Sequence, residues 1–254
     1  MPIKSTSIEP KPDPRIANKL ATYARALAQW CLPYTCALCG CDSDKQRDLC
    51  SICEAVLDRL SNRCAVCALP LIEEDEPIVC RSCRESPPSF DRICGLFPYQ
   101  PPLPSLITAL KFNSQLAYAR LLGELLAESA ATHWCKNLPL PQVLIPVPLH
   151  DSRLRQRGYN QALELARPLA RQLQLPIDAK ACKRIKLTRP QSSLAATARK
   201  RNLRSAFTVN KNLPYQHVAI IDDVVTTGST VIALSEALKA NGVERVEIWC
   251  VCRA

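Results

Sequence analysis

The sequence VAIIDDVVTTGST, at Val218–Thr230, is the most informative segment of the chain for its fold. Its β-branched beginning, within 217–221, predicts a buried parallel strand. The Thr, Gly and Ser residues that follow predict a short loop that opens a helix. Backbone N–H groups at a helix N-terminus bind phosphate well, and Gly228 permits close approach of a ligand to the backbone. Four hydroxyl groups add further hydrogen-bond donors, on Thr226, Thr227, Ser229 and Thr230.

Two adjacent acids, Asp222 and Asp223, are expected to leave the carboxyl end of this strand. Ligands of α/β sheets bind at that end of the strands. The two carboxylates could bind vicinal hydroxyl groups directly, or Mg²⁺ through water. An ordinary strand–helix turn is the less favoured interpretation, because adjacent acids beside a sheet are costly to bury without a partner.

Strands and helices alternate around this stretch. The apolar run at 143–147 is bounded by prolines and predicts a second buried strand. The segment 183–204 is expected to be irregular at first and then helical. The other expected strands are 92–99 and 243–251, and the expected helices are 104–112, 115–132, 161–173 and 228–241. This alternation predicts an α/β domain with a parallel sheet.

Four CxxC pairs precede the α/β domain. Two such knuckles complete a tetrahedral zinc site with four thiolate ligands. Pairing of neighbours would give two zinc ribbons in tandem, and interleaved pairing stays open. Cys41 lies beside the first knuckle and could compete as a ligand. The predicted ligands are Cys36, Cys39, Cys50, Cys53, Cys64, Cys67, Cys80 and Cys83. Closed sites of this kind rarely do chemistry, so a surface for a protein partner is their expected role.

The chain of 254 residues is expected to have three parts. Residues 1–30 would form a disordered tail and a short amphipathic helix, 31–88 the double zinc ribbon, and 89–254 the α/β domain. We find no secretory signal and no run of the ~18 apolar residues needed to cross a bilayer. A cytoplasmic protein that is not integral to the membrane is therefore expected, with cysteines used for metal rather than disulfides.

The net charge of +10 is concentrated in one segment. Residues 151–204 hold fourteen Lys or Arg against three Asp or Glu, whereas the rest of the chain holds 19 and 20. Such a patch indicates phosphate, nucleic acid or anionic lipid. In an extended loop, Arg153, Arg155 and Arg157 would point the same way and could clamp a diphosphate or a DNA backbone. The alternative is a salt-bridged helix start. Lys111, Arg189, Gln191, Arg199 and Arg201 could extend the basic rim.

The Val218–Thr230 stretch resembles the phosphoribosyl pyrophosphate (PRPP) motif of type I phosphoribosyltransferases. The resemblance implies that Asp222 and Asp223 contact the ribose hydroxyls and magnesium, and that Thr226–Thr230 hold the 5-phosphate. Several purine-salvage members carry an acid where this chain has Thr226. That substrate class is therefore less favoured.

Further stretches resemble the ComF family, which includes GntX-type proteins. They are CALCG at 36–40, LKF at 110–112, VLIPVPLHDSRLRQRGYNQA at 143–162 and RPQSSLAATARKRNLRSAF at 189–207. The resemblance implies a role in natural transformation, with handling of incoming single-stranded DNA at the cytoplasmic face of the inner membrane, or use of DNA as a nutrient. A DNA-uptake protein or helicase could then bind the zinc ribbons. Pro101–Pro102 and Asn113–Ser114 are less typical of the family.

Three functions stay open on the sequence. One is a DNA-handling protein that keeps a PRPP site. Another is a working phosphoribosyltransferase, since the DDVVTTGST loop is intact and such enzymes need little covalent help from the protein. The last is an adaptor that senses PRPP and presents its ribbons to a partner. The sequence shows no pocket that specifies an acceptor base.

Overall fold

The computed structural model describes residues 34–71, 78–186 and 206–254. The chain divides into two compact units, Met1–Glu54 and Ala55–Ala254, and each is described by itself. The expected tail and helix in 1–30 lie outside the described residues. So do Arg189, Gln191, Arg199 and Arg201 of the expected basic rim.

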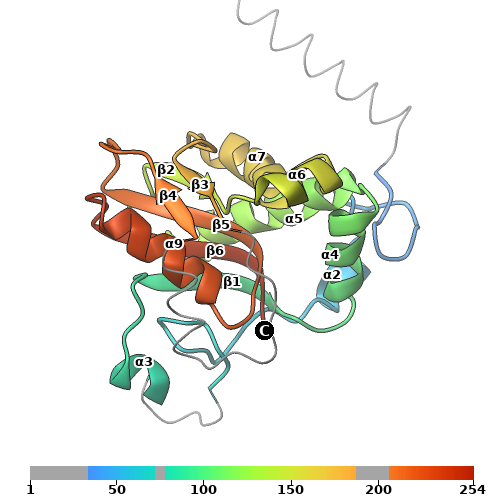
Figure 1. The fold of residues 1–254 in the computed structure, drawn as a ribbon. Helices are drawn as coiled ribbons and strands as arrows, with labels where there is room; N and C mark the ends of the chain where they lie inside the picture. The colour runs from blue at the N-terminus through green and yellow to red at the C-terminus, as the bar shows by residue number, and fades with distance from the viewer. Residues whose placement is uncertain (1–33, 72–77, 187–205) are drawn as a thin grey trace, which may run out of the picture. The chain divides into compact units, whose positions relative to one another are not determined.

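A four-stranded parallel sheet forms the centre of the second unit (Figure 1). Its strand order is β1 (Arg92–Pro98), β6 (Arg245–Arg253), β5 (His217–Val225), β2 (Val143–Pro146), and every pairing is parallel. The four expected strands are thus confirmed. Strands β5 and β6 are buried along nearly their whole length, as expected of parallel strands covered on both faces.

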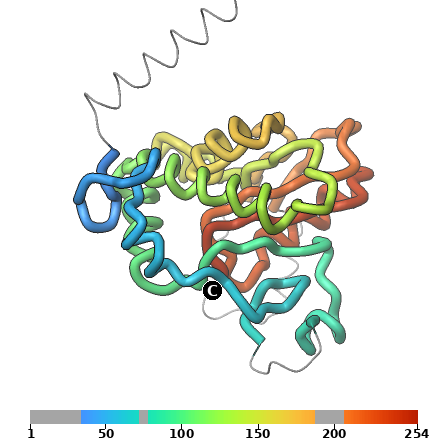
Figure 2. Tube along the Cα trace, turned by 180° about the vertical axis from the view of Figure 1, so that it is seen from behind, coloured from blue at the N-terminus to red at the C-terminus, as the bar shows by residue number. Residues whose placement is uncertain are grey.

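Helices cover both faces of this sheet. Helices α5 (Leu116–Ser129) and α7 (Gln161–Leu173) lie side by side on one face, and α9 (Ser229–Lys239) lies on the other (Figures 1 and 2). Helix α4 (Leu103–Phe112) precedes α5, which continues into a π-helical turn at Ala130–Trp134. The expected helices 104–112, 115–132, 161–173 and 228–241 are therefore confirmed. No helix of the described residues is both long and apolar enough to cross a bilayer.

Helices α5 and α7 approach each other closely at Gly123. A Cβ atom there would lie 2.5 Å from the backbone oxygen of Leu165 and 2.4 Å from a ring carbon of Pro168. The absence of a side chain at this position lets the helices pack, with Leu165 and Leu169 fully buried against the sheet. This pairing fixes α7, whose N-terminus lies near the candidate site.

The structure corrects the expectation for 183–204. Residues Cys182–Arg184 form β3, which pairs antiparallel with β4 (Phe207–Val209) in a separate two-stranded sheet. The two strands are joined by a stretch that lies mostly outside the described residues, so the expected helix there is not tested. Local polarity hid β3, because one of its two buried residues is the charged residue Arg184.

A buried acid joins three strands at the amino end of the sheet. Glu247 in β6 is fully buried and accepts hydrogen bonds from Arg92, His217 and Trp249, at distances of 3.0–3.2 Å. Arg245 forms an ion pair with it at 2.7 Å. Burial alone would raise the pKa of Glu247. Hydrogen bonds from His217, Arg92 and Trp249 outweigh that effect and lower it to about 2.

We expect Glu247→Gln to lower the free energy of unfolding by about 3 kcal/mol at pH 7, because two arginines lose their counter-charge. Since the pKa of Glu247 falls from 4.5 to about 2 on folding, its stabilisation is present above about pH 4.5 and is lost as the pH falls toward 2. Urea denaturation of both proteins from pH 7 to pH 3 measures the difference. Acid also removes metal from thiolates, so only the difference between the two proteins is interpreted. A difference that does not shrink with falling pH would contradict the assignment.

Candidate functional site

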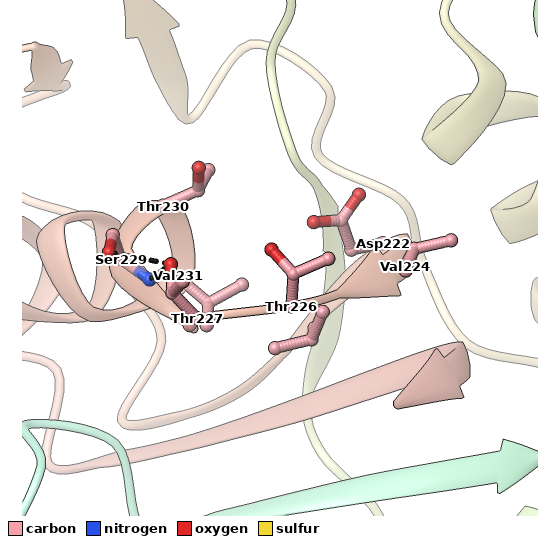
Figure 3. Close-up of a pocket in the computed structure, with 9 residues that line it drawn as sticks. Asp222, Val224, Thr226, Thr227, Ser229, Thr230 and Val231 are labelled. Atoms are coloured by element: carbon pink, nitrogen blue, oxygen red, sulfur yellow. Dashed lines mark hydrogen bonds between the residues drawn. The ribbon is translucent and has the colours of Figure 1, made fainter. Parts of the chain in front are cut away.

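The loop between β5 and α9 forms a polar pocket (Figure 3). Gly228 is the N-cap of α9, with φ +75, a backbone conformation that favours glycine. A Cβ atom there would meet nothing closer than 3.8 Å, so conformation rather than space requires the glycine. The Oγ atoms of Thr227 and Ser229 lie 2.8 Å apart. The pocket is lined by Asp222, Val224, Val225, Thr226, Thr227, Gly228, Ser229, Thr230 and Val231.

The two acids lie inside β5, which continues to Val225, and not beyond its carboxyl end as expected. Because consecutive strand residues point to opposite faces, Asp222 and Asp223 diverge. Asp222 lines the pocket and accepts a hydrogen bond from the backbone N–H of Asp223, at 2.9 Å. Burial raises the pKa of Asp222 well above its ordinary value, and the charge of Asp223 raises it further.

Asp223 contacts residues from other elements. Its carboxylate is 3% exposed and forms an ion pair with Lys111 at the end of α4. Gln161 Nε2 lies 3.5 Å from its other oxygen, a weak hydrogen bond. Lys111 was predicted to contact a pyrophosphate or a DNA backbone. In the structure its ammonium group pairs with Asp223.

The arginines of 153–157 are helical, not extended as expected. They belong to α6 (Asp151–Arg157), whose N-cap is His150. With 3.6 residues per turn, Arg153 and Arg157 share one face and Arg155 points elsewhere. The sequence hid this because two-residue spacing suits a strand as well as a polar helix. The helix precludes a clamp made of all three arginines on one side.

Arg157 is held between a ring and an amide. Its guanidinium carbon lies 5.4 Å from the centroid of the Phe112 ring, and Nη1 donates to Gln161 Oε1. Burial lowers the pKa of Arg157, while the charge of Asp223 opposes this effect. Phe112 itself is 72% exposed. The acid, the amide, the arginine and the exposed ring thus form one continuous set of contacts.

Sequence reasoning missed a buried cation near the pocket, Arg184. It lies in β3, stacks on the ring of Phe207 at 5.5 Å, and is 8% exposed. Burial lowers its pKa, the charge of Arg153 lowers it further, and Asp222 opposes both. These three charges therefore lie within electrostatic reach of one another. The pairing of β3 with β4 brings Arg184 close to Asp222, and the residues around Arg184 in the sequence do not predict this position.

Neighbouring CxxC pairs come together, so interleaved pairing is excluded. The sulfur atoms of Cys36, Cys39, Cys50 and Cys53 lie within 4.8 Å of one another, and so do those of Cys64, Cys67, Cys80 and Cys83. A tetrahedron with metal–sulfur bonds of about 2.3 Å has edges of about 3.8 Å. The Cys39–Cys50 and Cys67–Cys80 sulfur pairs are 3.8 and 3.7 Å apart. Both groups fit a metal ion with four thiolate ligands, and neither includes Cys41.

The two groups repeat the same backbone geometry. In each first knuckle, the leading cysteine N–H donates to the carbonyl five residues on, from Cys36 to Cys41 and from Cys64 to Leu69. Each second knuckle begins a short helix, α2 (Ser51–Ala55) or α3 (Arg81–Glu85). Burial would raise the pKa of Cys64, but backbone N–H groups of Cys67 and Cys80 lower it to about 7.

Comparison with known proteins identifies the domain that carries the pocket. A model of the phosphoribosyl transferase domain matches residues 160–254. Among solved structures, the chain is similar to a purine phosphoribosyltransferase from Pyrococcus horikoshii, with 21% identity and a TM-score of 0.31 over 56% of this chain and 84% of that one. We base the fold assignment on the match to the domain model and on the parallel sheet, and not on this structural similarity.

Curated relatives cover most of the chain. DNA utilization protein YhgH of Shigella flexneri is 38% identical over 81% of this chain and 90% of the relative. The protein of the same name from Escherichia coli K12 is 37% identical over the same shares. Competence protein F of Haemophilus influenzae is 41% identical over 69% of this chain and 78% of the relative. With its phosphoribosyl transferase domain and two four-cysteine groups, the chain belongs to the ComF family of competence and DNA-utilization proteins.

Proposed function

We propose that this chain handles single-stranded DNA in competence or DNA utilization, and that it binds PRPP or another ribose 5-phosphate ligand with Mg²⁺. One observation carries the ligand proposal. Asp222 and the Gly228-capped start of α9 line the same pocket. A helix N-terminus attracts phosphate, and a buried carboxylate beside it suits the hydroxyls of a ribose.

The proposed roles divide along the loop. Thr226, Thr227, Ser229 and Thr230 would donate hydroxyl hydrogen bonds to the 5-phosphate, together with backbone N–H groups around Gly228. Asp222 would accept from the ribose hydroxyls. Asp223 already has Lys111 as its partner, so its proposed role is to hold that lysine beside the ligand.

Magnesium fits this site through water and phosphate oxygens rather than through both acids. Of the two carboxylates, only Asp222 lines the pocket. The raised pKa of Asp222 reflects burial and a neighbouring negative charge. A bound cation would offset both effects, because it stabilises the ionised carboxylate. Mg²⁺ keeps several waters and takes few protein ligands in phosphate sites. It would neutralise the diphosphate, while Arg153 and Arg184 offer positive charge nearby.

Single-stranded DNA is the proposed partner at the Phe112 side of the site. An exposed aromatic ring offers a stacking face to any base, and arginine adds positive charge beside it. Phe112 is 72% exposed with Arg157 on its ring, and Arg155 is exposed on the same short helix as Arg157. We place the protein in the cytoplasm, where thiolates stay reduced, at the face of the membrane where an incoming strand arrives.

Zinc is the proposed metal of both cysteine groups, because closed sites with four thiolates are typical of structural zinc. The first group is the proposed surface for a DNA-uptake or helicase partner. Its helix α2 carries Ile52, which is 77% exposed beside the ligands Cys50 and Cys53. A lone exposed side chain is common, so its part in recognition depends on the metal-bound surface around it.

Phosphoribosyl transfer is a second candidate, favoured by the two arginines near Asp222 that could stabilise leaving pyrophosphate. It requires release of pyrophosphate from Mg·PRPP with at least one acceptor among purines, pyrimidines and amines. A coupled assay for pyrophosphate measures this release. Absence of release with every acceptor, from protein that binds Mg·PRPP, would exclude the enzymatic role and leave the binding role intact.

Calorimetric titration of Mg·PRPP tests the ligand proposal. We expect wild type to bind, and Asp222→Asn/Asp223→Asn to lose at least about tenfold in affinity, or ~1.4 kcal/mol. Asp222→Asn alone should account for most of the loss, because only Asp222 lines the pocket. Glu244→Gln is the matched control, since this exposed acid precedes β6 at the opposite end of the sheet. No binding by zinc-loaded wild type would overturn the proposal.

Fluorescence anisotropy with labelled oligothymidine tests the DNA proposal. Base stacking on an aromatic ring is worth ~1–3 kcal/mol, so we expect Phe112→Ala to weaken binding about tenfold. Binding should also weaken steeply with added salt, because phosphate contacts release counterions. Leu138→Ala is the control, since this exposed apolar side chain precedes β2 at the other end of the sheet. An affinity that neither the Phe112 substitution nor salt changes would contradict this surface.

A further inference from the structure

The first knuckle of the second cysteine group packs into the core of the parallel sheet. Ala68, between the ligands Cys67 and Cys80, is fully buried in the core cluster that contains Phe90 and Ile93. The carbonyl of Val66 accepts the backbone N–H of Ile93 in β1, at 2.7 Å. Side chains thus continue from the first knuckle of this group into the core of the parallel sheet, all within the unit Ala55–Ala254.

One arginine joins this knuckle to the pocket. Arg253 is the last residue of β6 and is 6% exposed. Its Nε donates to the carbonyl of Cys67 at 2.8 Å, and its Nη1 donates to the carbonyl of Val225 at 2.9 Å. Nη1 also lies within hydrogen-bond distance of the carbonyls of Thr226 and Ala254. A single guanidinium therefore contacts a metal-ligand residue and the first residue of the phosphate loop.

The chemistry of this contact makes it rigid. Among the described residues, no Asp or Glu side chain pairs with Arg253, and its buried charge is satisfied by main-chain oxygen atoms. Losing one of these bonds would leave a buried donor unsatisfied, which is unfavourable. The guanidinium is a planar fork with fixed donor directions. A shift of the Cys67 carbonyl would therefore change the alignment of the donors at Val225 and Thr226.

We propose that Arg253 is a positioning residue that couples metal binding in the second cysteine group to ligand binding at the phosphate loop. Zinc bound to Cys67 would fix the backbone of the knuckle, and Arg253 would transmit that position to Thr226. The inference rests on the proposed binding of a ribose 5-phosphate ligand. Such coupling is reciprocal, so the ligand must tighten zinc binding by the factor by which zinc tightens ligand binding.

The test uses the full chain with Cys39→Ser, which leaves the second group as the intact four-cysteine site. Zinc affinity is measured by competition with a chelator that buffers free zinc, with and without saturating Mg·PRPP. The buffer keeps free zinc constant although phosphates also bind metal. We expect Mg·PRPP to tighten zinc binding at least about fivefold. Addition of Arg253→Lys keeps the charge but removes the fork, and should abolish the shift while Mg·PRPP still binds.

Hydrogen exchange supplies a readout independent of ligand. In the zinc-loaded proteins, we expect the amides of 226–230 to exchange faster with Arg253→Lys than with arginine. An equal ligand-induced shift in zinc affinity with Arg253→Lys would overturn the role of Arg253. Binding of Mg·PRPP by the Cys39→Ser protein without any shift in zinc affinity would overturn the coupling itself. Failure of zinc-loaded wild type to bind Mg·PRPP would overturn the proposed ligand itself, and this inference with it. Where Arg253→Lys does not fold, the Cys39→Ser protein still tests the coupling, because absence of the shift would overturn the proposal and its presence would support it.

Discussion

The central constraint on this structure is the burial of charge in strands β5 and β6. Parallel strands covered by helices on both faces exclude water, so each ionised group needs a partner from another element. Glu247 takes side chains from β1, β5 and β6. Asp223 takes Lys111 from α4, and Arg253 takes backbone carbonyls from the cysteine knuckle and the loop. The positions of α4, the knuckle and the edge strand follow from these requirements.

The two ends of the sheet satisfy their charges differently. At the amino end, Glu247 has three hydrogen-bond donors, an ion pair with Arg245 and a pKa of about 2, so it stays ionised and structural. At the carboxyl end, Asp222 lines an open pocket and its pKa is raised by burial and by Asp223. A carboxylate with a strongly raised pKa in a pocket indicates a functional site. The proposed ligand would supply partners for Asp222 that the protein does not provide, namely hydroxyl donors of the ribose and a hydrated Mg²⁺ ion.

The parts of the fold that depend on local pattern were predictable from the sequence. The helix at 161–173 and the Thr–Gly–Ser loop that opens α9 follow from spacing, glycine and hydroxyl residues. The arginines of 153–157 were misassigned because two-residue spacing fits both strand and helix, and the N-cap of α6 is a histidine side chain rather than a common capping residue. Arg184 and Arg253 could not be found in this way. Their roles depend on β3–β4 pairing and on contacts 28 and 186 residues apart in the chain.

The second cysteine group is better understood as part of the α/β unit Ala55–Ala254 than as a module attached to it. Its segment of about twenty residues is too short to bury a core of its own, so it depends on metal and on the sheet. Ala68 is buried in the core cluster that contains Phe90 and Ile93, and the Cys67 carbonyl accepts a hydrogen bond from Arg253. Because metal binding in such sites is folding free energy, part of the stability of the loop at Thr226 would derive from zinc bound at Cys67. The metal and the ribose phosphate would then stabilise one another through a single buried guanidinium.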